Sequence, residues 1–168
     1  MADPRVHEVV GATWAGTIGY AAAKAGDLVY YDLVSDNNKW EKADPTPGIA
    51  ATDMPYNVSK YAQAVVVHSG INDSDPCVLA KEVYLIDVDA APYSQGGKKL
   101  YLSATAGAFT ETRPTTAGDL VQVVGETVDS PNLGSSLTAD KTQLAHIKIN
   151  GPYEITQSIS PHNATGTG

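Results

Sequence analysis

Hydrophobic residues in this chain occur in short runs, and polar or turn-forming residues separate the runs at fairly regular intervals. Val, Leu, Ile and Tyr dominate the runs, whereas Gly, Pro, Asn, Asp and Ser fill the gaps, a distribution typical of short β-strands joined by turns. Many short strands favour a mainly β domain, either a β-sandwich or a β-barrel. The predicted strands are 28–34, 39–42, 64–68, 77–88, 100–103, 108–112, 119–128 and 143–149.

Signals for helices are scarce. The pattern predicts only a few short helices, one over 14–24 and one over 57–64, although Gly16 and Gly19 disfavour the first. Three prolines in the segment 43–62 predict a long loop, and loops of this length inside a compact domain are usually functional or mobile.

The two ends of the chain differ from its middle. Residues 1–13 precede any clear turn and mix valines with charged residues, so they are predicted to form an extended N-terminal arm. Residues 158–168 are polar and rich in Gly, which predicts a flexible tail. The β-rich domain is therefore predicted to span 14–157.

The five residues AGDLV occur twice, at 25–29 and at 117–121. In both copies Gly can supply a tight turn and Asp can bond to the backbone beyond it, and a strand follows at once. The two strands are predicted to bury the same face, with Val29 and Leu33 inward in one and Val121 and Val123 inward in the other. The repeated phrase is therefore interpreted as sheet architecture and not as chemistry.

The acidic net charge of the chain limits the kinds of partner it can bind. The 168 residues carry 11 basic and 19 acidic side chains, a net charge of −8, and no run of Lys or Arg. A nucleic-acid binder needs clustered cations to displace counterions from phosphate, and an anionic membrane surface attracts basic segments. The composition thus disfavours both partners.

The single cysteine cannot form an intrachain disulfide, so a cross-linked secreted framework is not expected. The first twenty residues contain charged side chains without a continuous apolar stretch, which is unlike a signal peptide. No segment approaches the roughly 18 apolar residues that span a bilayer. These features predict a protein made in a cytoplasm.

Candidate catalytic and metal-binding residues are dispersed. The histidines, His7, His68, His146 and His162, show no spacing that builds a zinc site. Cys77 opens an apolar strand without a signature of a nucleophilic thiol.

Two acidic segments also bear on metal binding. The oxygen-rich segment 72–75 resembles part of a calcium loop but lacks the Gly and the closing Glu, so a polar turn is favoured. Asp87 and Asp89 would share one face of a strand, most simply at a solvated edge. The sequence therefore predicts no catalytic, cofactor or metal site and a protein that is not an enzyme.

One stretch, 96–128, reads GGKKLYLSATAGAFTETRPTTAGDLVQVVGETV and predicts a hairpin, a turn guided by Pro and a third strand. It resembles a pattern found in virion proteins of tailed bacteriophages, especially head decoration (capsid cement) proteins. The segment 26–40 is similar to an earlier sheet segment of such proteins. The elements that carry the resemblance are Gly97, 100–103, 106–107, Thr110, Thr112, Pro114, 118–119 and 121–125.

The resemblance implies a viral structural protein on the exterior of an assembled capsid, made in the host cytoplasm. Such proteins are commonly homotrimers at three-fold or quasi-three-fold sites, where they hold neighbouring copies of the major capsid protein together. The arm would add a strand to a capsid subunit or lie across it, and large aromatic side chains would anchor the trimer. The candidate arm contacts are Asp3, Arg5, Val6, His7, Val9 and Val10, and the candidate interface residues are Trp14, Tyr20 and Trp40.

Three other functions remain open on the sequence alone. The chain could be a tail or fibre component of the virion. It could be a carbohydrate-binding β-sandwich in which Tyr and Trp form a stacking platform. It could also be an enzyme that uses Cys77 or the pair Asp87 and Asp89.

Overall fold

The computed structural model describes residues 4–33, 38–45, 60–88, 97–116, 118–128, 143–150 and 153–155. Every regular element within these ranges is a β-strand, so the predicted mainly β class is confirmed. None of the described segments is a helix with the length and hydrophobicity needed to cross a bilayer. The predicted tail at 158–168 lies outside the described residues.

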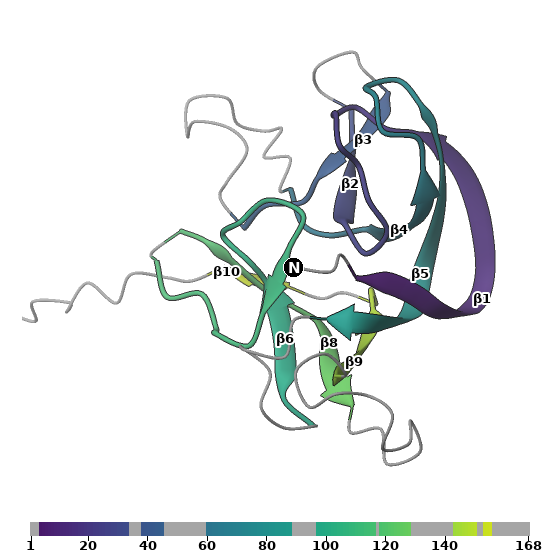
Figure 1. Ribbon diagram of the computed structural model, residues 1–168. Helices are drawn as coiled ribbons and strands as arrows, with labels where there is room; N and C mark the ends of the chain where they lie inside the picture. The colour runs from purple at the N-terminus through teal and green to yellow at the C-terminus, as the bar shows by residue number, and fades with distance from the viewer. Residues whose placement is uncertain are drawn as a thin grey trace, which may run out of the picture.

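Ten strands pair into one antiparallel sheet that curves strongly on itself (Figure 1). The order of the strands along the sheet is β3-β2-β4-β5-β9-β8-β6-β7, with β1 beside β5 and β10 beside β8. The strands are β1 (Arg5–Thr17), β2 (Leu28–Asp32), β3 (Lys39–Lys42), β4 (Ala64–Ser69), β5 (Pro76–Val88), β6 (Lys99–Leu102), β7 (Phe109–Thr110), β8 (Leu120–Val128), β9 (Gln143–Lys148) and β10 (Tyr153–Ile155).

The long strand β5 connects the two parts of the sheet. Along one edge it pairs with β1 over almost its whole length, from Thr17 opposite Pro76 to Arg5 opposite Ile86. Its other edge is shared, because β4 pairs with the first half of β5 and β9 pairs with the second half. At Lys81, between these two halves, β5 changes its partner from β4 to β9.

The strands β1, β5, β4, β2 and β3 form a barrel-like half of the molecule. The chain just after β1 reaches β3, where Ile18 forms a parallel bridge with Trp40 and the N–H of Gly19 donates to the Trp40 carbonyl oxygen at 2.9 Å. These contacts bring together the two ends of the five-stranded series, so the strands follow one another around a ring. Figure 1 shows this curved half beside the group formed by β6, β8 and β9.

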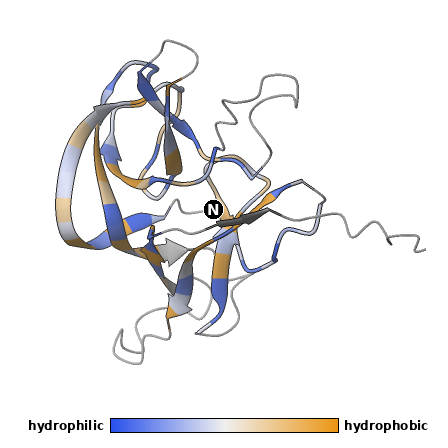
Figure 2. Ribbon diagram, turned by 180° about the vertical axis from the view of Figure 1, so that it is seen from behind, coloured by the Kyte–Doolittle hydropathy of each residue, from blue (hydrophilic) through white to orange (hydrophobic). Residues whose placement is uncertain are grey.

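The core lies on both faces of β2 and β4. Neighbouring residues such as Val65 and Val66, or Leu28 and Val29, belong to opposite clusters, and all four side chains are fully buried. Figure 2 shows hydrophobic residues distributed over strands of both parts of the sheet. The main cluster contains Leu28, Ala43, Ala62, Val65, Ala80, Val83, Leu85, Leu100, Leu102, Val124, Ala145, Ile147 and Ile149. The second cluster contains Ile18, Ala23, Val29, Ala64, Val66, Cys77 and Leu79.

Both copies of the repeated phrase form the turn that was predicted. Gly26 and Gly118 each have φ +91°. The N–H of Asp27 donates to the Lys24 carbonyl oxygen at 3.2 Å, and the N–H of Asp119 donates to that of Thr116 at 3.1 Å. The strands β2 and β8 begin directly after these turns. A related turn precedes β7, where the N–H of Ala108 donates to the Thr105 carbonyl oxygen at 3.0 Å.

The predicted common buried face is wrong beyond the first residues of β2 and β8. Leu33 is 69% exposed and Val123 is 40% exposed, although both were placed inward. Both strands begin instead with three consecutive buried side chains, 28–30 and 120–122. Burial on both faces removes the alternation that a strand exposed on one face would show.

The helix predicted over 14–24 is also wrong, because β1 continues to Thr17 and the next residues form a bridge and bends. A Cβ added to Gly16 would lie 2.7 Å from two indole atoms of Trp40, so this glycine makes room for the ring against the strand. Ala22 has φ +57°, which an α-helix does not accommodate. The second predicted helix, 57–64, lies partly outside the described residues, and its described part is not helical.

Candidate functional site

The predicted N-terminal arm is extended, but it is a paired strand of the sheet from Arg5 onward. The strand continues past residue 13 without a break, so the predicted boundary between arm and domain does not coincide with the end of an element. Within the described chain β1 pairs only with β5, and its far end alone meets β3. Among the described residues, its other edge therefore has no strand partner along most of its length, and β1 forms an outer rim of the molecule in Figure 1.

The candidate arm contacts divide between the two faces of β1. Val6 and Val9 are partly buried and pack against the main cluster. The side chains of Arg5 and His7 are exposed, and Val10 is 36% exposed. Asp3 lies outside the described residues. One face of the strand thus holds the arm to its own domain while the other presents polar and apolar side chains to solvent.

Two irregularities interrupt the pairing of β1 with β5, between Val6 and Glu8 and between Val10 and Thr13. Such bulges bend and twist a strand, and edge strands often use them to prevent uncontrolled pairing with other chains. The ladder between β1 and β5 is consequently divided into short segments.

The three aromatic residues predicted to anchor an oligomer all pack against the second cluster and are partly buried. The ring centroids of Trp14 and Trp40 lie 6.2 Å apart at an angle of 53°, and Tyr31 meets Trp40 edge-on at 5.3 Å. The hydroxyl of Tyr20 donates to Asp27 at 2.9 Å. The structure thus brings these residues together as part of the barrel-like half.

Beside the two tryptophans lies a groove of about 490 Å³. The groove lies at the point along β5 where the pairing partner changes from β4 to β9. At this point the ammonium group of Lys81 donates to the Gln63 carbonyl oxygen at 2.5 Å. The side-chain oxygen of Gln63 accepts the backbone N–H of Tyr31 at 3.1 Å. The groove is lined by Trp14, Trp40, Tyr61, Ala62, Gln63, Lys81, Ile149 and Asn150. We call this site the tryptophan groove.

A second groove, of about 520 Å³, lies over β8 and β9. At its side Nε2 of His146 lies 2.7 Å from Oε1 of Glu82, and the imidazole stacks on Tyr84 with centroids 4.3 Å apart. His146 is partly buried and held by these two contacts. Its partners lie on β5, over sixty residues earlier in the chain.

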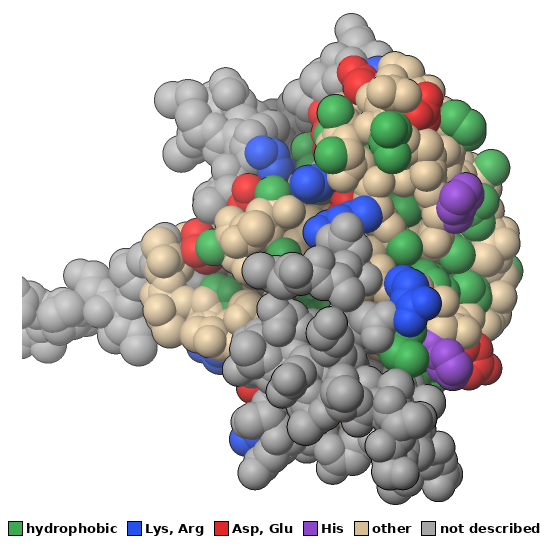
Figure 3. Space-filling model, in the orientation of Figure 1, with side chains coloured by type: hydrophobic (Ala, Val, Ile, Leu, Met, Phe, Trp, Pro, Cys, Tyr) green, Lys and Arg blue, Asp and Glu red, His purple; other side chains and the backbone are tan. Residues whose placement is uncertain are grey.

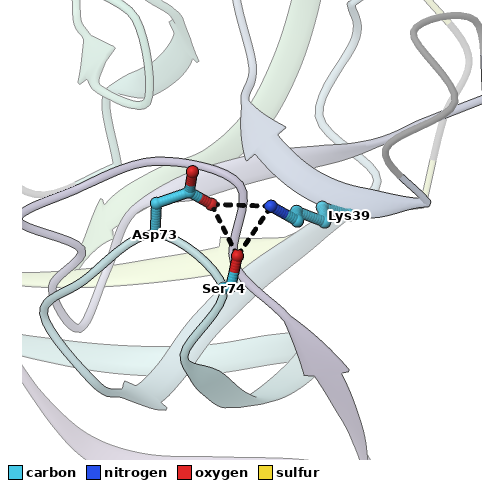
Figure 4. Close-up of polar contacts among 3 residues, drawn as sticks. All are labelled: Lys39, Asp73 and Ser74. Carbon is cyan, nitrogen blue, oxygen red and sulfur yellow. Dashed lines mark hydrogen bonds and ion pairs between the residues drawn. The ribbon is translucent and has the colours of Figure 1, made fainter.

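The segment 72–75 forms a polar turn. Asp75 accepts the backbone N–H of Asn72 at 2.8 Å, while Asp73 pairs with Lys39 at 2.8 Å and Ser74 bonds to both (Figure 4). The hydrogen bond from Lys39 holds the pKa of Asp73 below its ordinary value. Both carboxylates are therefore engaged within the protein. In the part of the chain that the structure describes, no three His, Cys, Asp or Glu side chains are grouped to hold a metal ion.

This turn belongs to one end of the barrel-like half. The N–H of Ala22 donates to the carbonyl oxygen of Ile71, and the N–H of Ser74 donates to that of Ile18, so neighbouring loops are tied together. Ile71 and Leu33 are each 69% exposed. Figure 3 shows hydrophobic side chains beside acidic ones at this end.

The candidate nucleophile Cys77 is only 4% exposed, and its side chain belongs to the second cluster. Burial raises the pKa of the thiol, which disfavours the reactive thiolate. His68, by contrast, is exposed on β4. Asp87 lies in β5 with its side chain outside the described part, and Asp89 and His162 lie outside the described residues.

The first copy of the repeated phrase contains a buried carboxylate. Asp27 is 5% exposed and accepts hydrogen bonds from the hydroxyl of Tyr20 and the backbone N–H of Lys24. Burial raises the pKa of Asp27, although both hydrogen bonds act in the opposite direction. Burial and the nearby Asp27 carboxylate also raise the pKa of Tyr20, so its hydroxyl remains a donor. Lys42 lies over the Tyr20 ring, 4.9 Å from its centroid.

No protein-family model, curated protein or solved structure matches this chain.

Trp14 and Trp40 were predicted from the sequence as contact residues, whereas the polar residues that line the groove beside them, Gln63 and Lys81, were not. Lys81 did carry a signal, because it stands with Glu82 inside the apolar run of the longest predicted strand. Gln63 directly precedes the buried run of β4, which is another place where a polar side chain meets a core. Lys81 and Gln63 come together because β5 changes its pairing partner from β4 to β9 at this point, and no local sequence pattern indicates that change.

Proposed function

We propose that this chain is a structural protein of a tailed-bacteriophage head that binds the outside of the assembled capsid and stabilises it. In this proposal it acts as a homotrimer at three-fold or quasi-three-fold sites, with the major capsid protein as its partner. The observation that carries the proposal is the open, largely exposed edge of β1, on the segment assigned to capsid binding. An edge of this kind presents unpaired backbone groups to which another chain can add a strand.

The stretch that resembles decoration proteins also folds as its pattern predicts. β6 pairs with β7 through Tyr101 opposite Thr110, and its other edge pairs with β8 through Leu100 opposite Gly125. This three-stranded unit contributes Leu100, Leu102 and Val124 to the main cluster. A β module joined through the sheet to a strand with an unpaired edge is suited to contact neighbouring capsid subunits at once.

Stabilisation requires no reaction. A protein that binds only the assembled lattice shifts the equilibrium toward that lattice, by RT ln(1 + [L]/Kd) for each site. Linked copies that bind the same shell raise the effective affinity well above that of one contact. Modest contacts along β1, repeated around a capsid, would thus be sufficient.

The test uses the full chain and empty expanded shells assembled from the major capsid protein encoded in the same genome. We expect the chain to sediment with the shells and electron microscopy to show added density at their three-fold sites. Shells that carry the chain should also dissociate at a higher temperature than bare shells. Failure of the full chain to bind these shells would overturn the proposal.

A pair of matched variants tests the surface. Val10 on β1 and Val123 on β8 have similar exposure, 36% and 40%, and both side chains project from strands. Val10→Lys should weaken binding to shells about tenfold or more, because it places a hydrated charge in the contact. Val123→Lys should bind like the parent chain. Equal binding by both variants would exclude the β1 surface.

A further inference from the structure

The tryptophan groove has the composition of a site for a neutral, hydroxyl-rich ligand. Its volume of about 490 Å³ falls within the range of roughly 300–1,000 Å³ that ligand sites occupy. Trp14, Trp40 and Tyr61 supply aromatic rings, and the two indoles are tilted by 53° to each other. Rings that are only partly buried leave faces on which the apolar face of a sugar ring can pack.

Polar groups that can orient such a ligand stand beside the rings. Asn150 is exposed, and its amide can both donate and accept. Gln63 uses its side-chain oxygen on Tyr31, which fixes the amide and leaves its N–H groups as donors. Among the described residues, neither indole N–H of Trp14 and Trp40 has an acceptor. Several donors and acceptors therefore surround a mainly aromatic surface.

Charge makes an anionic ligand a poor fit. Among the described residues, Lys81 is the only charged one that lines the groove, and part of its hydrogen-bonding capacity is used on the Gln63 carbonyl oxygen, so an anion would find no cluster of cations here. The chain carries a net charge of −8, which repels phosphorylated or carboxylated ligands. Hydroxyl groups need no compensating cation and match the available amides.

We propose that the tryptophan groove binds a neutral oligosaccharide, with a sugar ring packed on Trp14 and Trp40 and its hydroxyls bonded to Asn150 and Gln63. The groove is lined by Lys81 of β5, by residues 61–63 just before β4 and 149–150 just after β9, and by the side chains of Trp14 on β1 and Trp40 on β3. The proposed capsid contact lies instead along the backbone edge of β1 that faces away from β5. The two sites can therefore act in one molecule, and either assignment can fail without the other.

Intrinsic fluorescence reports directly on this groove, because the chain contains two tryptophans and both line it. The full chain is titrated separately with maltohexaose, cellohexaose and chitohexaose. We expect at least one of them to shift the emission in a saturable way, with a Kd of about 1 mM or tighter. It should also protect the indoles from quenching by acrylamide.

Asn150→Ala should weaken this binding about fivefold to tenfold, because it removes a hydrogen-bonding group from the ligand. Asn72→Ala is the matched control, since Asn72 is also exposed but does not line the groove, and it should bind like the parent chain. Trp14→Phe keeps a ring and should retain weaker binding, reported by Trp40. Absence of a saturable change with all three sugars, or equal binding by Asn150→Ala, would overturn the proposal. Binding of indole without binding of any sugar would also overturn it.

Discussion

The turn before β2 and the turn before β8 share five residues, the same hydrogen bond and the same φ of +91° at glycine, yet they have different neighbours. A Cβ added to Gly26 would lie 3.2 Å from Leu85 and 3.5 Å from Pro4, whereas one added to Gly118 would have nothing within 4 Å. The first turn is therefore packed against the core and the N-terminal segment, and the second is open at its glycine.

The strands that follow are fixed by distant parts of the chain. The N–H of Leu28 donates to the Gly107 carbonyl oxygen at 2.9 Å, and the N–H of Leu120 donates to that of Pro45 at 2.8 Å. Each strand thus begins at a local turn and is placed by a partner far away in sequence. A repeated phrase can therefore specify the same turn twice, while the residues packed around each copy decide how much stability depends on it.

The largest expected effect comes from replacing each turn glycine by alanine. A positive φ costs an alanine about 1–2 kcal/mol at either position. At position 26 the added methyl group must also displace Leu85, so we expect Gly26→Ala to lose about 2–4 kcal/mol of unfolding free energy and Gly118→Ala about 1–2 kcal/mol. Urea denaturation followed by circular dichroism measures both. A loss at Gly118 equal to that at Gly26 would show that packing around the glycine does not distinguish the turns.

The next largest loss of unfolding free energy is expected at Asp27, where two variants separate its role as a hydrogen-bond acceptor from its charge. Asp27→Ala leaves the Tyr20 hydroxyl and the Lys24 N–H without their acceptor, which should cost about 1–3 kcal/mol of unfolding free energy. Asp27→Asn keeps an oxygen acceptor and avoids burial of a charge, so it should cost less than Asp27→Ala. The same urea experiment distinguishes them. Equal losses for the two variants would mean that the acceptor contributes little to the first turn.

Local patterns could predict much of this fold because turns and strands depend on nearby residues. The strand class, both AGDLV turns and the 97–128 module follow from residue types whose preferences are local. The buried faces of β2 and β8 could not be predicted in the same way. Leu33 and Val123 occupy hydrophobic positions of an alternating pattern. Because the first part of each strand is buried on both faces, that alternation does not indicate which side chains are buried.

In the candidate sites, too, the residue types could be predicted from the sequence, but their positions relative to one another could not. The sequence indicated that Trp14 and Trp40 are important aromatic residues, but their proximity depends on the contact between β1 and β3. The pair of His146 and Glu82 joins strands separated by more than sixty residues, and Gln122 binds both backbone groups of Ala62 across a similar distance. Contacts of this kind depend on sheet topology, for which a single sequence provides little information.

The smallest expected effect is a dependence of stability on pH that originates in the first turn. Burial raises the pKa of Asp27 above its ordinary value of 3.8, so in the pH range just above that value the folded state holds a proton that the unfolded state has released. Stability from this group is fully present below the ordinary pKa and is lost as pH rises, with a slope of at most about 1.4 kcal/mol per pH unit. The unfolding free energy of the parent chain should therefore fall relative to that of Asp27→Asn from about pH 4 upward.

The control for this effect is Tyr20→Phe. The hydrogen bond from Tyr20 lowers the pKa of Asp27, so its removal should raise that pKa further and extend the fall in stability to higher pH. Urea denaturation of the parent chain, Asp27→Asn and Tyr20→Phe at several pH values gives the three profiles. Parallel profiles for the parent chain and Asp27→Asn would show that Asp27 titrates alike in the folded and unfolded states.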